Sequence, residues 1–317
     1  MKKAILIFLF MMGIFSQTKA NSPASTEEQF RDSIFQVVNS KTNDTLRSKI
    51  LRGAFQQYIG QKAALEYLDS ALVLSKRKRI HEEELYTLFD YCRHYEYRGE
   101  ASEMEQYFLK LKEAAYRYKD YSLYYTIWLS VLQIRCAQGD TEYAIMQAKE
   151  MQKEAIRIKY ESGVFVSLIA LAQALDFAEQ YDEAIANYKQ ALIVNPNANN
   201  YSLLLIHQNL GGIYLAQKKY TEALSELKQQ QEVLNKMLKE DPQAINTLKS
   251  IFLEMEVSFG WVYAKIEDKA KLKLHLTRAE KYYDEESFFS YYIDYHALWG
   301  TYHKLEKDWD KCFHEFN

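Results

Sequence analysis

The stretch LIALAQALDFAEQYDEAIANYKQALIVNP, residues 168–196, decides the fold because it holds two helical patterns in succession. The first pattern repeats every three or four residues from Leu168, and the second begins near Asp182 and ends at Asn195-Pro196, since proline restricts the residue before it. The residues on the two faces are Leu168, Leu171, Ala172, Leu175, Ala184, Tyr188 and Ala191. The alanines let two backbones approach and the larger residues fill the remaining space. The stretch therefore predicts a packed pair of helices.

This pattern recurs along the chain with a period of about 40 residues. Its most regular position is an alanine or apolar residue near the start of each second helix, which we call the second-helix anchor. The anchors are Ala64, Met104, Ala144, Ala184, Ala223, Leu272 and Cys312. The intervals between them are 40, 40, 40, 39, 49 and 40 residues. A period of this kind predicts a solenoid, in which each repeat packs on its neighbours.

The repeats resemble the tetratricopeptide repeat. Residues 168–196 have that family's leucine, small, alanine, aromatic and proline residues in family order, with Leu168 in place of the opening tryptophan, and the next copy keeps Leu210-Gly211 and Tyr214. The family unit is about 34 residues long, so each unit here carries roughly six more and we expect longer helices. The resemblance implies an all-α, right-handed α-solenoid of about seven helix-turn-helix units over residues 45–317, with an incomplete last unit. An N-terminal segment or capping helix would occupy residues 21–44.

The amino end has the features of a secretory signal peptide over residues 1–20. Lys2-Lys3 precede an apolar run from Ala4 to Phe15, and Ala20 supplies a small residue before a cleavage site. The run is shorter than the 18 or more apolar residues that a membrane-spanning helix needs, and no later segment reaches that length. We therefore expect an exported, periplasmic or secreted chain whose mature part does not span a membrane.

The charge balance argues against a nucleic-acid partner. Without residues 1–20 the chain has 37 basic and 43 acidic residues, and its one basic run, Lys76 to Arg79, falls where a second helix should end and where it would face the helix dipole. The three cysteines, Cys92, Cys136 and Cys312, are an odd number, so a disulfide framework is not indicated. Cys92 and Cys136 lie on first-helix faces, which favours buried thiols.

No catalytic constellation is present in the sequence. It lacks a glycine-rich phosphate loop, a nucleophile elbow and a histidine-glutamate metal helix. His296 and His303 lie seven residues apart on one helical face, but like His207 they occupy positions that hold large packing residues in other copies. We therefore expect histidines satisfied at helix interfaces, no metal, no cofactor and no enzymatic activity.

In the tetratricopeptide family, exposed positions of the first helices line an inner groove. Projected onto this chain, that rule selects Tyr86, Phe89, Arg93, Glu96, Tyr97, Gln133, Gln173, Asp176 and Gln208. Aromatic anchors beside amide and charged side chains suit a peptide strand or helix. The family's lysine and asparagine clamp for a terminal carboxylate is absent, because Lys49 is followed by Gly53 and Gln56.

Three functions remain open at this point. The first is a non-enzymatic exported scaffold that binds a protein or peptide. The second is the sensory ectodomain of a transmembrane kinase or transcriptional regulator, since exported arrays of this layout resemble such ectodomains and the last unit stops at Asn317 without a polar cap. That open end predicts docking or a continuation. The third is carbohydrate binding by tyrosine clusters such as Tyr121-Tyr124-Tyr125 and Tyr291-Tyr292-Tyr295.

Overall fold

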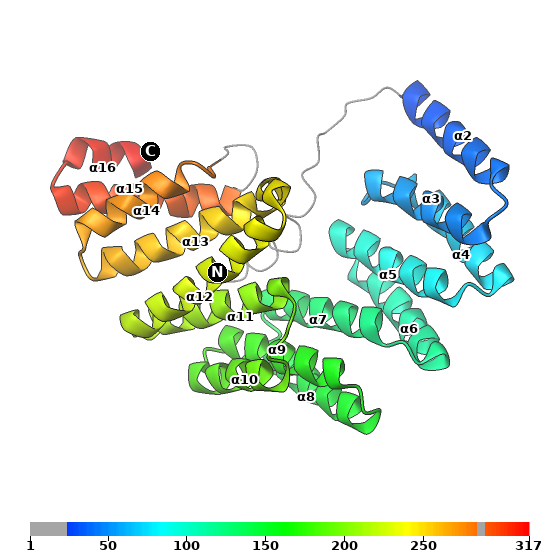
Figure 1. Ribbon diagram of the computed structural model, residues 1–317, viewed down its shortest axis with the longest axis horizontal. Helices are drawn as coiled ribbons and strands as arrows, with labels where there is room; N and C mark the ends of the chain where they lie inside the picture. The colour runs from blue at the N-terminus through cyan, green and yellow to red at the C-terminus, as the bar shows by residue number, and fades with distance from the viewer. Residues whose placement is uncertain (1–23, 284–288, 317) are drawn as a thin grey trace. The chain divides into compact units, whose positions relative to one another are not determined.

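The computed structural model describes residues 24–283 and 289–316, and every regular element in these ranges is helical. The predicted signal peptide lies outside the described residues. In Figure 1 the α-helices are α2 (Ala24–Ser40), α3 (Asp44–Gln57), α4 (Ala64–Lys78), α5 (His81–Arg98), α6 (Ala101–Tyr118), α7 (Ser122–Ala137), α8 (Thr141–Arg157), α9 (Glu161–Phe177), α10 (Tyr181–Val194), α11 (Asn200–Ala216), α12 (Tyr220–Glu240), α13 (Ile245–Lys265), α14 (Lys269–Ala279), α15 (Phe289–Glu306) and α16 (Trp309–Phe316). A 3-10 turn, η1 (Pro242–Ala244), precedes α13.

Consecutive helices pack in pairs, most extensively α3 with α4, α5 with α6, α11 with α12, α13 with α14 and α15 with α16, which confirms the predicted all-α solenoid. All seven second-helix anchors are buried. Six of them, from Met104 to Cys312, are the fourth residue of their helix, whereas Ala64 is the first. The long interval before Leu272 arises because α12 and α13 have 21 residues each. One helix, α2, precedes the pairs and falls within the predicted capping segment.

In the α3/α4 turn the left-handed residue is Gly60, four positions before Ala64. In the six later turns it lies five positions before the anchor. These residues are Gly99, Gly139, Glu179, Lys218, Glu267 and Lys307. The next backbone N–H donates to a carbonyl five residues back, as from Lys219 to Tyr214, which is the Schellman pattern that closes a helix end. Glycine is the usual residue here because it carries no Cβ penalty, yet four of the six are lysine or glutamate.

The described residues form two compact units, one of residues 24–132 and 151–167 and the other of residues 133–150, 168–283 and 289–316. The boundary falls within α7, α8 and α9. In the first unit α3 packs on α4 and α5 on α6, around a core that includes Leu51, Phe55 and Leu68. Lys76, Arg77 and Lys78 lie in the last turn of α4, which confirms their predicted place at a helix end.

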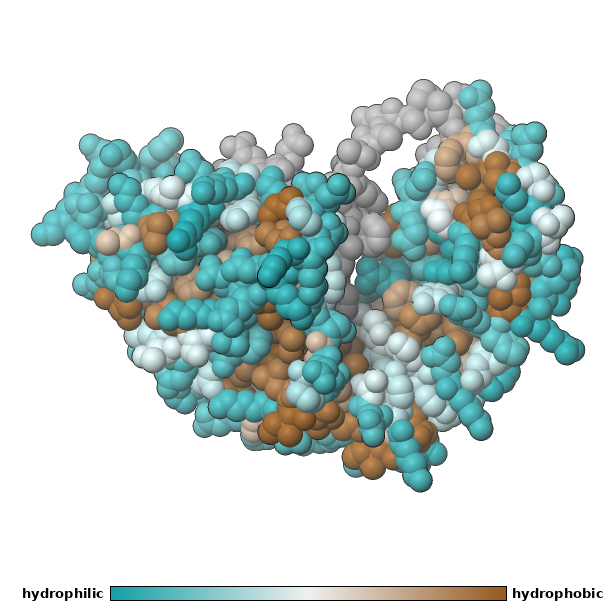
Figure 2. Space-filling model, in the orientation of Figure 1, coloured by the Kyte–Doolittle hydropathy of each residue, from teal (hydrophilic) through white to brown (hydrophobic). Residues whose placement is uncertain are grey.

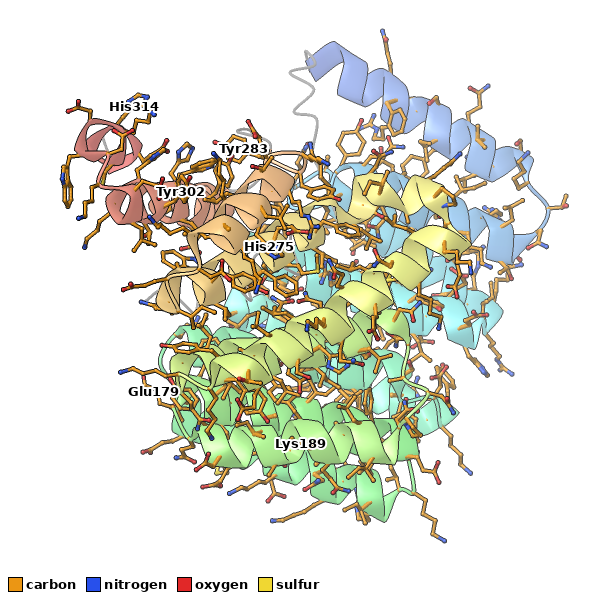
Figure 3. The ribbon with its side chains drawn as sticks, turned by 60° about the vertical axis from the view of Figure 1, so that its left-hand side comes forward. Glu179, Lys189, His275, Tyr283, Tyr302 and His314 are labelled. Carbon is orange, nitrogen blue, oxygen red and sulfur yellow. The ribbon has the colours of Figure 1, made fainter. Side chains whose placement is uncertain are left out.

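In the second unit, three successive helix pairs are each bridged by a histidine and a glutamate 19 residues apart. His207 Nδ1 lies 2.7 Å from Glu226 Oε2, and the pairs His275–Glu256 and His296–Glu315 both span 2.6 Å. His275 is buried and lies within the α13/α14 pair, whereas Lys189 and Glu179 are exposed (Figure 3). These contacts confirm that His207 and His296 are satisfied at helix interfaces.

Buried thiols and a largely polar surface complete the fold. All three cysteines are buried and unpaired, which confirms the buried thiols expected at Cys92 and Cys136. Burial raises the pKa of the Cys136 thiol to about 12. Figure 2 shows hydrophilic residues over most of the face in view, with hydrophobic patches among them. Among the described helices, none is long and apolar enough to cross a bilayer.

Candidate functional site

The structure divides the predicted groove residues between the two units. Tyr86, Phe89, Arg93, Glu96 and Tyr97 lie on α5 in the first unit, and the other four lie on α7, α9 and α11 in the second. On α5 the two tyrosines are 36% and 40% exposed, whereas the three residues between them are partly buried. The α5 surface therefore offers two aromatic rings to solvent, whereas the other three positions, which were also expected to be exposed, are partly covered.

An ionic network fixes α5 against α3. Arg52 on α3 donates from Nε to Asp90 Oδ2 at 2.6 Å, and its guanidinium lies over the Tyr86 ring, 4.6 Å from the centroid. Gln56 Nε2 also donates to Asp90, at 3.2 Å. Asp90 was not among the residues predicted from the sequence. Arg52 and Asp90 are 38 residues apart, which is close to one repeat period. Residues one repeat apart face each other across neighbouring first helices, and that spacing is the signal that could have found this pair.

Burial governs the electrostatics of this surface. Desolvation raises the pKa of the Asp90 carboxyl to about 6, against the opposing effect of Arg52. It also raises the pKa of Glu96, and here Arg93, 3.2 Å from the carboxylate, and a hydrogen bond from Ser130 work in the other direction. The α5 surface is therefore held in place by largely internal charge pairs, and Tyr86, beside Arg52, and Tyr97 are its most accessible predicted groove residues.

Two of the predicted groove residues in the second unit are buried, which corrects the expectation that they are exposed. Gln173 is 2% exposed and Asp176 is 7% exposed. Gln133 Nε2 on α7 donates to Gln173 Oε1 on α9 at 2.9 Å, so this amide joins neighbouring first helices. The physical reason is that successive first helices cover each other's flanks, so a polar residue there meets protein before it meets solvent.

Asp176 and Gln208 are brought together in a pocket of about 110 Å³ on α9, α11 and α13, with one further lining residue, Leu227, from α12. Ten residues line it: Asp176, Gln208, Asn209, Gly211, Gly212, Leu215, Leu227, Glu254, Ser258 and Val262. Within this pocket, Gln208 Nε2 on α11 donates a hydrogen bond to Glu254 Oε1 on α13. Of these lining residues, Asp176 and Gln208 were predicted as groove residues from the sequence, whereas Asn209, Glu254 and Ser258 were not. Gln208 and Glu254 are 46 residues apart, one repeat lengthened by the long α12 and α13.

Two polar atoms of this pocket have no internal partner. Gln208 Oε1 and Asn209 Nδ2 are buried without a hydrogen bond in the described part of the chain. Asn209 is only 9% exposed. Most buried polar groups in proteins are hydrogen-bonded, so an acceptor and a donor left open on one pocket wall are suited to bind a ligand.

Other candidate sites receive less support from the structure. Tyr124 and Tyr125 are buried and packed against Trp128, so they offer no ring face to a sugar, and Tyr295 is buried as well. The side chains of Tyr291 and Tyr292 lie outside those described. Among the described residues no group of three or more histidine, cysteine, aspartate or glutamate side chains is arranged to hold a metal ion.

No protein-family model matches the chain. No curated protein sequence matches it either. Among solved structures, the chain is similar to "Crystal structure of BtubC (BKLC) from P. vanneervenii", with a TM-score of 0.48 and 17% sequence identity over 74% of this chain and 87% of that one. The fold and the pocket together define the class of protein as an all-α solenoid of helix pairs with polar sites on its first helices.

Proposed function

We propose that this chain is an exported, non-enzymatic scaffold of the tetratricopeptide type that binds a protein or peptide partner on its first helices. The observation that carries the proposal is the pocket on α9, α11 and α13, whose buried Gln208 Oε1 and Asn209 Nδ2 have no partner in the described part of the chain. A peptide backbone supplies both a donor and an acceptor, so it can satisfy both atoms.

The α5 surface supports the same function. Tyr86 and Tyr97 present exposed rings, and tyrosine provides large contact area at low conformational cost. Arg52 and Arg93 are held by acidic neighbours, so the surface is ordered before a partner arrives. Preorganised side chains lose less entropy on binding. Export is proposed from the signal-like residues 1–20 alone.

The proposal is tested by capture of a partner. We expect immobilised chain from residue 21 onward to retain a specific protein from an envelope extract, identified by mass spectrometry. Two double variants, Tyr86→Ala with Tyr97→Ala and Gln208→Ala with Asn209→Ala, separately probe the two surfaces. At least one should reduce the retained amount about tenfold or more, as expected for an interface hot spot.

The matched control is Lys189→Ala, which changes an exposed residue on the second helix α10 and should leave capture unchanged. Each variant is first checked for an unaltered melting curve. Equal retention by the wild type and both double variants, or no specific retention at all, would reject a binding role for the first helices.

A further inference from the structure

The pocket on α9, α11 and α13 has a definite electrostatic character. Two carboxylate side chains, Asp176 and Glu254, line it, and none of its ten lining residues is lysine, arginine or histidine. Glu254 is buried and accepts a hydrogen bond from Gln208 Nε2, which leaves Gln208 Oε1 as a further acceptor. A positively charged group would therefore meet acceptors from three successive first helices.

A second, independent feature points to a ligand. Asn209 Nδ2 lies in the same pocket, is buried and has no hydrogen-bond partner in the described residues. This donor cannot pair with a cation, but it can pair with a carbonyl oxygen. The pocket thus combines acceptors for a cation with one donor for a neutral acceptor, and a basic residue within a peptide carries both groups.

The size of the pocket limits the ligand. Its volume of about 110 Å³ is well below the roughly 300–1,000 Å³ of pockets for drug-sized ligands. A single side-chain head group fits these dimensions better than a folded element does. An added Cβ at Gly212 would meet no atom within 4 Å, so the backbone there leaves the pocket open.

We propose that this pocket binds the cationic head group of an arginine or lysine side chain in an extended partner peptide. This inference rests on the proposed function, because it names the chemistry of the partner. Asp176 and Glu254 neutralise the head group, Gln208 Oε1 accepts one of its N–H groups, and Asn209 Nδ2 donates to a main-chain carbonyl of the peptide. Hydrogen bonds to charged groups contribute about 1.5–3 kcal/mol, which corresponds to roughly tenfold or more in affinity.

The test uses the chain from residue 21 onward and three pools of fluorescein-labelled nonapeptides that differ only in a fixed central residue: arginine, its neutral isostere citrulline, or glutamate. Fluorescence polarisation should show that the arginine pool binds about tenfold more tightly than the citrulline pool, with the glutamate pool weakest. The Asp176→Asn with Glu254→Gln variant should remove this preference. Glu179→Gln with Glu222→Gln removes the same charge at exposed positions and should retain it.

Two further measurements keep the result interpretable. Gly212→Leu fills the pocket without removing a polar group and should weaken the arginine pool, and a melting curve for each variant reports whether the chain is folded. N-acetyl-arginine amide serves as the small-molecule arm. If it binds as tightly as the arginine pool, the assignment to a peptide is overturned.

Failure of this inference and failure of the proposed function are distinguishable. Equal binding of the arginine and citrulline pools, or preference for glutamate, overturns cation recognition while peptide binding stands. If no pool binds and the capture experiment retains nothing, both are overturned.

Discussion

At the scale of single residues, Gly260 on α13 has the least room among the glycines that lie inside the described helices. A Cβ added there would collide with the side chain of Leu298 on α15. Overpacking a buried site costs about 1–3 kcal/mol, whereas alanine in place of a helical glycine gains about 1 kcal/mol. We expect Gly260→Ala to lower the free energy of unfolding by up to about 2 kcal/mol net, measured by urea denaturation.

Gly211 provides the matched control. A Cβ at this position would lie 3.5 Å from Leu227, an ordinary contact, so Gly211→Ala should be neutral or slightly stabilising. A leucine at this position would extend beyond that contact and should destabilise the α11/α12 pair. If Gly211→Ala and Gly260→Ala had the same effect, backbone propensity rather than space would govern both positions.

Asp90 should make stability depend on pH. Its folded-state pKa is raised to about 6, above the value of about 3.9 in an unfolded chain, so the folded state holds this proton more tightly. The stabilisation is therefore fully present below about pH 4 and is lost as the pH rises to about 6. Relative to Asp90→Asn, the wild-type free energy of unfolding should fall by about 2–3 kcal/mol between pH 4 and pH 7.

The measurement is a pair of urea titrations at each pH, for the wild type and Asp90→Asn, so that other titrating groups cancel in the difference. Asp32→Asn, at an exposed carboxylate on α2, is the control and should show a small difference. A wild-type advantage that grows with pH would mean that the ion pair with Arg52 outweighs desolvation and that the carboxyl titrates below its ordinary value.

At the scale of elements, the turn between α11 and α12 contains a residue with a strained backbone conformation, and a substitution can relieve this strain. Lys218 has a φ of 61°, in the left-handed region that favours glycine. Glycine removes a conformational cost of about 1–2 kcal/mol but adds backbone entropy of about 0.5–1 kcal/mol to the unfolded chain. We expect Lys218→Gly to raise the free energy of unfolding by up to about 1.5 kcal/mol, read from denaturation midpoints.

The same substitution ten residues later should have the opposite sign. Lys228 is exposed and lies inside α12, where glycine costs about 1 kcal/mol relative to a good helix former. Destabilisation by both substitutions would show that the Lys218 side chain contributes contacts that outweigh its backbone strain.

These elements were largely predictable, and the reason is the small volume between paired helices. Ala144, Ala184 and Ala223 are fully buried, so the close approach of two backbones imposes the regular spacing of anchors that is visible in the sequence. The left-handed turn residues between the helices were harder to predict from the sequence. Gly99 and Gly139 indicate two of them, whereas Glu179 and Lys218 adopt the same backbone without any residue-type signal.

At the scale of the whole molecule, the period predicts which residues can meet but not which of them stay exposed. Gln173 was expected in a groove, yet it is buried and bonded to Gln133, one period away in the sequence. Exposure on a first helix depends on the side chains of the next first helix, and a single helical pattern contains no information about them. Fold prediction therefore succeeded where it depended on one repeat, and site prediction was partial because it depends on two.

Pairing between neighbouring first helices leaves few polar side chains available to bind a ligand. Arg52 with Asp90, Gln133 with Gln173, and Gln208 with Glu254 each join neighbouring first helices about one repeat apart. Groups used in this way stabilise the stack and have less capacity left for a ligand. Gln208 Oε1 and Asn209 Nδ2 remain open after that pairing within the described chain, so their pocket has hydrogen-bonding energy to gain from a partner.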